Sequence, residues 1–104
     1  MESLTQQTLE GSRQASELLK SMANETRLQI LCLLCEREMS VGELNECFPL
    51  SQSALSQHLA LLRKEGLVQT RREAQRVLYS LDSAEARAVI GTLYGLFCAP
   101  AQGD

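Results

Sequence analysis

Residues 40–81 read SVGELNECFPLSQSALSQHLALLRKEGLVQTRREAQRVLYSL, and this stretch carries the signals that decide the fold. Ser40 and Glu43 have the spacing of a capping box, in which each side chain accepts a hydrogen bond from the other residue's backbone N–H. This pattern predicts a short helix that begins at Val41. Pro49 ends the helix because its ring nitrogen has no hydrogen to donate.

Ser51 is predicted to cap a second helix that runs to about Glu65 and ends at Gly66. Two strand-like runs follow, Leu67 to Arg72 and Arg76 to Leu81, with a polar tip between them. Two helices joined by a tight turn are typical of a helix-turn-helix motif. A hairpin directly after the second helix is typical of the wing in a winged helix. The stretch therefore predicts a winged helix-turn-helix that binds DNA.

Helices are also predicted on both sides of this stretch. A polar but periodic segment predicts a helix over about residues 3–23. Asn24 is predicted to cap the next helix, TRLQILCLLCE, which is apolar nearly all round and therefore belongs at the centre of the fold. Asp82 with Glu85 predicts the start of a last helix, which ends at about Cys98.

These elements predict a mainly α-helical protein with a small β-hairpin, in the order four helices, two strands and one helix. All 104 residues are expected to form a single domain, with a DNA-binding core at about 40–81. The flanking helices, at about 3–23 and 83–98, carry apolar stripes that predict a two-fold dimer interface. The alternative is that they pack only on their own domain. Two-fold symmetry would make the operator an inverted repeat.

The charge distribution supports DNA binding, although the net charge of the chain is −3. From Ser51 to Ser80, five basic residues accompany two acidic ones, a local charge of +3 that leaves −6 for the rest of the chain. A basic helix and hairpin on an acidic body are typical of a surface that binds phosphate.

The predicted helix after Ser51 has an apolar side and a polar side. At about 100° per residue, Leu55, Leu59 and Leu62 share the apolar side. Small hydroxyl and amide side chains lie opposite and can approach base edges closely. The candidates for base or groove contact are Gln52, Ser53, Ser56 and Gln57. The candidates for contact with the DNA backbone or minor groove are Arg72 and Arg76, with Arg71 as an alternative.

Other classes of protein find little support in the sequence. It has no glycine-rich phosphate loop and no G-x-S-x-G motif, and its one histidine, His58, lies on the buried side of its helix, so no enzyme is predicted. No run approaches the roughly 18 apolar residues of a membrane span, and no signal peptide is evident. These features predict a cytoplasmic protein whose four cysteines are not in structural disulfides. A protein-interaction module without DNA binding is the rival class.

SALSQHLALLRKEGLV and the hairpin ending in VLYSL resemble the winged-helix core of the ArsR/SmtB family of dimeric repressors. The resemblance implies a double-stranded DNA operator and a homodimer. Many members sense metals, but the arsenic-type motif ELCVC reads ELNEC here, with Asn45 in place of its first cysteine, and residues 83–98 lack the histidines of the zinc site. No metal ligand is assigned. A metal- or metalloid-responsive repressor with cysteine ligands is the alternative function.

ILC at residues 30–32 and LFC at 96–98 resemble the thiol-responsive branch of that family. This resemblance implies that Cys32 and Cys98 form a redox-sensing pair, linked by a disulfide or a polysulfide, with Cys35 and Cys47 as accessory thiols. Cys35 could also compete with Cys32 for Cys98. Reactive oxygen or sulfur species would be the inducer, and no cofactor is implied. The predicted function is a repressor or anti-silencer that releases its operator on cysteine oxidation or persulfide formation.

Overall fold

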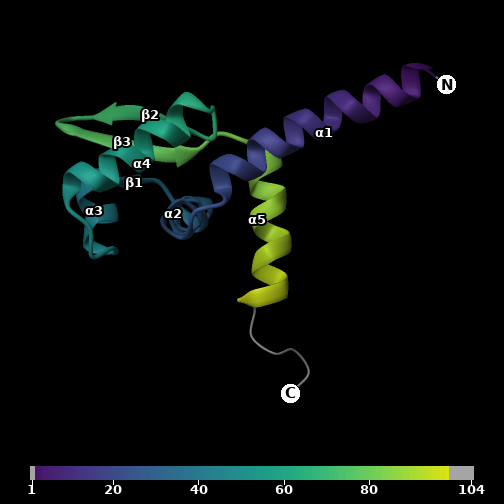
Figure 1. Cartoon of the computed structure of the whole chain (residues 1–104). Coiled ribbons are helices and arrows are strands. Elements are labelled where there is room, and N and C mark those ends of the chain that lie inside the picture. Colours follow the sequence, from purple (N-terminus) through teal and green to yellow (C-terminus); the bar gives the residue numbers. More distant parts are fainter. Residues whose placement is uncertain (1, 99–104) are drawn as a thin grey trace.

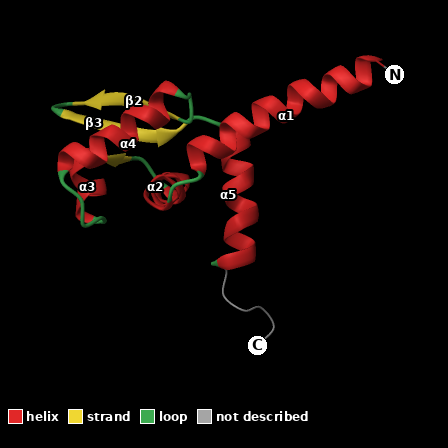
Figure 2. Ribbon diagram, in the orientation of Figure 1, coloured by secondary structure: helices red, strands yellow, loops and turns green. Residues whose placement is uncertain are grey.

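The computed structural model describes residues 2–98, with side chains described from residue 5 onward. The helices and strands are, in order, α1 (Glu2–Met22), α2 (Glu25–Glu36), β1 (Met39–Ser40), α3 (Val41–Glu46), α4 (Gln52–Lys64), β2 (Val68–Glu73), β3 (Arg76–Leu81) and α5 (Ala84–Phe97). The predicted mainly helical fold with a small hairpin is confirmed (Figure 2). Within the described range, no helix has both the length and the apolar character needed to cross a membrane.

The sheet has three antiparallel strands in the order β1-β3-β2, one more than predicted. Strands β2 and β3 form the predicted hairpin, with Val68 opposite Leu81 and Glu73 opposite Arg76. Strand β1 pairs with the other edge of β3 and places Met39 opposite Tyr79. The sequence could not predict β1 because two residues are too few to form an alternating pattern.

The predicted caps of α2, α3 and α4 are confirmed. The Ser40 Oγ accepts from the Glu43 N–H at 3.1 Å, and a Glu43 carboxylate oxygen accepts from the Ser40 N–H at 2.9 Å. Asn24 and Ser51 cap α2 and α4 in the same way. Gly66 follows α4 with φ +80°, a left-handed conformation that glycine adopts without steric cost.

The predicted cap of the last helix is wrong by one residue. The side chain of Ser83, rather than that of Asp82, accepts a hydrogen bond from the backbone N–H of Ala86, at 3.0 Å. Both residues are good caps, so the sequence alone could not decide between them. Asp82 instead continues the backbone path out of the sheet, where its N–H donates to the Leu67 carbonyl at 2.8 Å.

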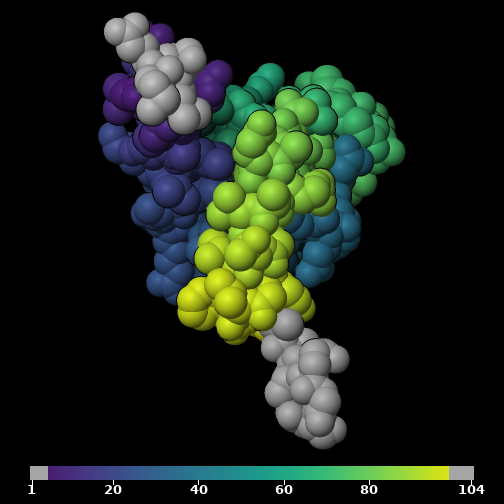
Figure 3. Space-filling view, turned by 90° about the vertical axis from the view of Figure 1, so that its right-hand side faces the viewer, coloured from purple at the N-terminus to yellow at the C-terminus, as the bar shows by residue number. Residues whose placement is uncertain are grey.

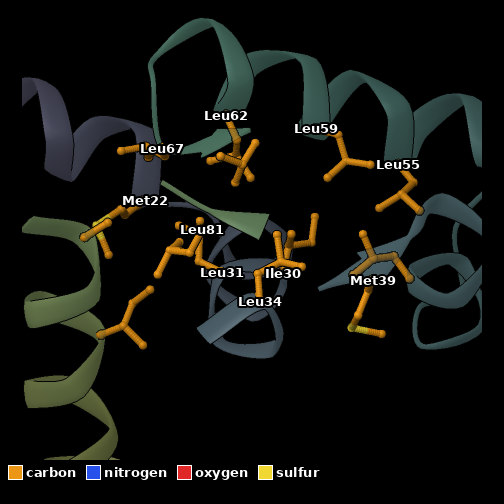
Figure 4. Packing of buried hydrophobic residues seen from close by; sticks show 14 residues of the cluster. Met22, Ile30, Leu31, Leu34, Met39, Leu55, Leu59, Leu62, Leu67 and Leu81 are labelled. Carbon is orange, nitrogen blue, oxygen red and sulfur yellow. The ribbon is translucent and has the colours of Figure 1, made fainter. Parts of the chain in front are cut away.

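Helix α2 passes through the centre of the molecule, as its apolar sequence predicted. Ile30 and Leu31 are fully buried and Leu34 nearly so. Figure 4 shows these side chains between α4 above and α5 to the side. The α4 side chains that reach this core are Leu55, Leu59 and Leu62, which are the three that the helical wheel assigned to the buried side.

Helices α1 and α5 extend away from the body formed by α2, α3, α4 and the sheet (Figure 1). Helix α1 is anchored mainly at its end, where Met22 is buried, and most of its described side chains are exposed. Helix α5 buries Ala86 and Ile90 but leaves its last turns at the surface (Figure 3). The body therefore contains the whole helix-turn-helix and wing, and the two projecting helices lie outside it.

Candidate DNA interface and thiol groove

The sequence-predicted base-contact residues lie together on one exposed face of α4. Gln52, Ser53, Ser56 and Gln57 are all exposed, on the side of the helix opposite its buried leucines. Ser51 caps the helix by accepting from the Ala54 N–H at 3.1 Å, and Gln52 and Ser53 of the first turn are exposed. Small polar side chains on an exposed helix face can approach base edges in a major groove.

The two wing arginines predicted to touch DNA are both exposed, but they differ in their partners. Arg76 pairs across the tip with Glu73 at 3.2 Å. Arg72 makes no ion pair or hydrogen bond through its side chain within the described residues. The tip between them is tight, and Ala74 takes φ 58° there. Arg72 therefore has the less neutralised charge of the two.

Arg71, the alternative DNA contact, is engaged within the protein. Its guanidinium donates two hydrogen bonds to the two carboxylate oxygens of Glu38, each at 2.8 Å. A fork of this kind is a strong and directional form of ion pair. It ties the wing to the segment between α2 and β1, so Arg71 positions the wing. The sequence offered no signal for this pair because 33 positions separate the two residues.

We expect the Glu38–Arg71 pair to make stability depend on pH in the acid range. The hydrogen bond from Arg71 lowers the pKa of the Glu38 carboxyl below its ordinary value. A lowered pKa in the folded state stabilises the fold above the ordinary glutamate pKa of about 4.3, and this stabilisation is lost as the pH falls through the folded pKa. Glu38→Gln should therefore melt below the wild type at about pH 7 and together with it at about pH 2.

Thermal melts followed by circular dichroism test this prediction, with Glu36→Gln as the matched control. Glu36 is an exposed neighbour that makes no ion pair within the described part of the chain. A Glu38→Gln protein that melts with the wild type at both pH values would contradict the prediction.

His58 is half-buried, in line with its predicted position toward the apolar side of α4. Its side chain makes no hydrogen bond to the described residues. Half-burial among apolar neighbours is sufficient to explain its position.

All four cysteines line one groove of about 820 Å³ between α2, the end of α3 and α5. Cys32 and Cys35 are half-buried on α2, whereas Cys47 and Cys98 are exposed at the ends of α3 and α5. The remaining lining residues are mainly apolar on α2 and α5, with a few charged groups among them. The fold thus brings together thiols that are 66 positions apart in the chain (Cys32 to Cys98).

The thiols of α2 are held in their protonated form. Burial raises the pKa of Cys32, and the neighbouring Cys35 and Cys98 raise it further. Burial also raises the pKa of Cys35, but the Arg87 guanidinium partly offsets that rise. Because the thiolate is the reactive form, oxidation of Cys32 should become faster as the pH rises toward its raised pKa. Cys98 lines the same groove as Cys32, so the fold brings the two predicted partners to one surface.

Arg87 joins α5 to the end of α2 by donating a hydrogen bond to the Cys35 carbonyl at 3.2 Å. No group of three or more Cys, His, Asp or Glu side chains with the geometry of a metal site occurs in the part of the chain that the structure describes. Neither Arg87 nor Glu38 was singled out from the sequence, because both act through partners distant in the chain.

The projecting helices expose large apolar side chains. On α5, Tyr94 is 48%, Leu96 70% and Phe97 80% exposed. On α1, Leu9 and Leu19 are similarly exposed, at 66% and 53%. Large apolar side chains exposed on projecting helices are typical of surfaces that bind another protein chain.

Comparison with known proteins gives consistent matches. Residues 24–70 match the model of the family described as bacterial regulatory protein, arsR family. The chain is 58% identical to the transcriptional activator HlyU of Vibrio cholerae, over 89% of this chain and 86% of that protein.

Two solved structures are similar over nearly their whole length. Reduced HlyU from Vibrio cholerae matches with a TM-score of 0.86 at 57% identity, over 90% of this chain and 99% of that one. The transcriptional repressor BigR from Xylella fastidiosa matches with a TM-score of 0.83 at 36% identity, over 92% of this chain and 98% of that one.

The winged helix-turn-helix, its exposed polar helix face and these matches define a DNA-binding transcriptional regulator rather than an enzyme. The chain belongs to the arsR family of bacterial regulatory proteins, and HlyU and BigR are among its relatives there. The family predicted from the sequence is therefore confirmed.

Proposed function

We propose that the protein binds an inverted-repeat operator as a homodimer while its thiols are reduced. Linkage of Cys32 to Cys98, by a disulfide or a polysulfide, then releases the DNA. The observation that carries this proposal is the gathering of all four cysteines in one groove between α2 and α5. The cytoplasm, where thiols are kept reduced, is the proposed compartment.

The proposed switch acts through the two helices that its bond would join. Helix α2 lies at the centre of the DNA-binding body, and α5 belongs to the proposed dimer interface. A disulfide requires Cα atoms within about 7 Å, so forming one would fix the angle between body and interface. A changed angle prevents the two recognition helices of a dimer from reaching successive half-sites, and DNA affinity falls.

The oxidation step balances with peroxide as the oxidant. A thiolate of one cysteine attacks the peroxide, becomes a sulfenic acid and releases water or an alcohol. The second thiolate then attacks the sulfenic sulfur, forms the S–S bond and displaces water. With an inorganic polysulfide as the oxidant, one thiolate breaks an S–S bond of the polysulfide, keeps part of its sulfur chain and releases the shorter polysulfide or sulfide. The second thiolate then attacks the retained chain and displaces sulfide, which leaves the remaining sulfur atoms between the two cysteines. Reactive oxygen or sulfur species are therefore the proposed inducers.

The proposed division of the single domain follows the sequence prediction. Residues of about 40–81 contact DNA, and helices at about 3–23 and 83–98 form the dimer interface. Exposed apolar residues on α1 and α5 support this assignment. Bound protein would either repress transcription directly or displace a silencer, and release of the DNA would end either effect. The relatives include proteins named as an activator and as a repressor.

A gel-shift experiment with reduced and oxidised protein tests the switch. The DNA probe is a duplex selected from a random-sequence library by the reduced wild type. Wild type, Cys35→Ser and Cys47→Ser should lose at least about tenfold in affinity after treatment with peroxide or polysulfide, a coupling of typical allosteric size. Cys32→Ser and Cys98→Ser should keep their affinity. A Cys98→Ser protein that still releases DNA on oxidation would disprove the proposed pair.

We expect the two kinds of predicted DNA contact to fail differently. Gln57→Ala should weaken binding to the selected duplex by about tenfold and leave binding to unrelated duplexes nearly unchanged, because it removes a base contact. Arg76→Ala should weaken both by a similar factor, because phosphate contacts carry no sequence information. Fluorescence anisotropy with both duplexes measures the ratio of the affinity for the selected duplex to that for an unrelated duplex. If Gln57→Ala leaves this affinity ratio unchanged, Gln57 is not a base contact. Alanine variants tested in the same way address Gln52, Ser53, Ser56 and Arg72.

A further inference from the structure

A second groove, of about 460 Å³, lies between the exposed face of α4 and strand β3. Figure 1 shows α4 running beside the β2–β3 hairpin. The groove is lined by Ser56, Ala60, Arg63, Lys64 and Tyr79. We propose that it holds a phosphate of the DNA backbone, bound by Lys64, Arg63 and the Tyr79 hydroxyl. The inference rests on the proposed use of the α4 face in the major groove, and it adds three residues that were not predicted to contact DNA.

The lining of this groove is suited to an anion. It contains two cations and two hydroxyl groups, and no carboxylate. Glu65 is the next residue in the chain after Lys64, but it lines the grooves on the opposite side of α4, beside Glu17 and Ser21 of α1. The acidic charge nearest in sequence is therefore directed away from the site.

The polar groups of the groove have no partners within the described protein. The side chains of Arg63 and Lys64 make no ion pair there, and the Tyr79 hydroxyl makes no hydrogen bond. By contrast, Arg71 and Arg76 of the wing are already paired with glutamates. Ammonium, guanidinium and phenol groups are all donors to a phosphate oxygen. Within residues 51–80, the basic side chains without an ion pair are therefore Arg63 and Lys64 at this end of α4 and Arg72 on the wing.

The spacing along α4 fits the dimensions of DNA. Ser56, Ala60 and Lys64 are four residues apart and form one row on the helix. At 1.5 Å per residue, Lys64 lies about 12 Å beyond Ser56 along the axis, and the major groove is about 12 Å wide. With Ser56 at the base edges, Lys64 therefore reaches the phosphates of a bordering strand. The small side chain of Ala60 leaves space for the phosphate between them.

A purely structural role of Arg63 and Lys64 predicts a different result. Basic residues in the last turn of a helix interact favourably with its dipole, and Arg63 and Lys64 occupy that turn in α4. Such a role would alter the stability of the protein and leave its affinity for DNA unchanged. Salt dependence separates the two roles, since each phosphate contact contributes about 0.9 to the slope of log K against log salt concentration.

The experiment measures anisotropy of a labelled random-sequence duplex with reduced, full-length protein over a salt series. Lys64→Gln and Arg63→Gln should each weaken binding about tenfold at roughly 0.1 M salt and reduce the slope by about one per subunit. Tyr79→Phe should weaken binding by a smaller factor without changing the slope, because it removes an uncharged donor. Ala60→Glu should weaken binding far more than the isosteric Ala60→Gln. Arg37→Gln, whose side chain faces Glu43, is the matched charge control and should change nothing.

The outcomes separate this inference from the proposed function. If the reduced wild type does not bind duplex DNA, the proposed function itself is wrong. If the wild type binds while the Lys64, Arg63 and Ala60→Glu variants keep its affinity and slope, only the phosphate site is wrong. A change in melting temperature without a change in slope would likewise overturn the site in favour of the helix-dipole role. The Lys64, Arg63 and Ala60 variants are at exposed positions of α4, so the fold is expected to survive.

Discussion

Replacing Leu96 and Phe97 together by glutamate is expected to give a folded monomer that has lost at least about a hundredfold in operator affinity. These two side chains are the most exposed large apolar groups among the described residues. Glutamate at both positions would place two charges in the proposed two-fold interface, where burying an unpaired charge is costly. In a dimer, binding at one half-site raises the effective concentration of the second subunit at the other half-site. A monomer contacts one half-site only and has no such advantage.

Sedimentation velocity reports the association state, and anisotropy with the selected duplex reports the affinity. Leu96→Ile with Phe97→Leu is the matched control, since it keeps apolar surface and should keep the dimer. Because neither residue belongs to the buried core, the melting curve of the monomer should remain cooperative. A double-glutamate protein that still sediments as a dimer would move the interface to another surface. A wild type that sediments as a monomer would show that the proposed dimer interface does not exist.

Leu31→Ala is expected to lower the free energy of unfolding by about 2–5 kcal/mol. Leu31 is fully buried in α2, between α4 and the remainder of the core, so truncation leaves a cavity that the surrounding helices cannot close completely (Figure 4). For a domain of this size, each kcal/mol shifts the melting temperature by roughly 4–8 °C. The variant should therefore melt at least about 10 °C below the wild type.

Urea unfolding at fixed protein concentration measures this loss, because the stability of a dimer depends on concentration. Leu61→Ala is the control: the same atoms are removed from α4, but Leu61 is only partly buried. The loss in the free energy of unfolding should be clearly smaller for Leu61→Ala than for Leu31→Ala. Equal losses for the two variants would show that α2 is not the centre of the core.

The helix-turn-helix could be predicted almost residue by residue because its signals are local. Capping at Ser40 and Ser51 and termination at Gly66 each depend on hydrogen bonds or backbone angles within a few residues. The helical wheel also predicted the buried leucines of α4, since a period of 3.6 residues places them on one side. Among the predicted helix caps, only that of α5 was misplaced, where two adjacent residues have similar capping ability.

The short strand β1 and the wing contacts could not be predicted in the same way. Strand β1 exists because β3 offers a free edge to Met39 and Ser40, and their own sequence has no strand pattern. Similarly, Arg71 resembled its neighbour Arg72 in the sequence, but the fold places Glu38 against Arg71 alone. Pairing across the chain decides which wing arginine is neutralised.

The thiol groove was likewise predictable only in part from the sequence. A resemblance in short motifs named Cys32 and Cys98, and Cys35 shares the side of α2 with Cys32 because it lies three residues further on. Nothing in the sequence indicates that Cys47 lines the same groove. The sequence by itself determined the winged helix-turn-helix, the exposed polar face of α4 and the family, because caps, periodicity and local motifs are short-range properties. Only the tertiary structure decided which charges are paired and which thiols are neighbours, because those contacts form when burial of the α2 core packs distant segments together.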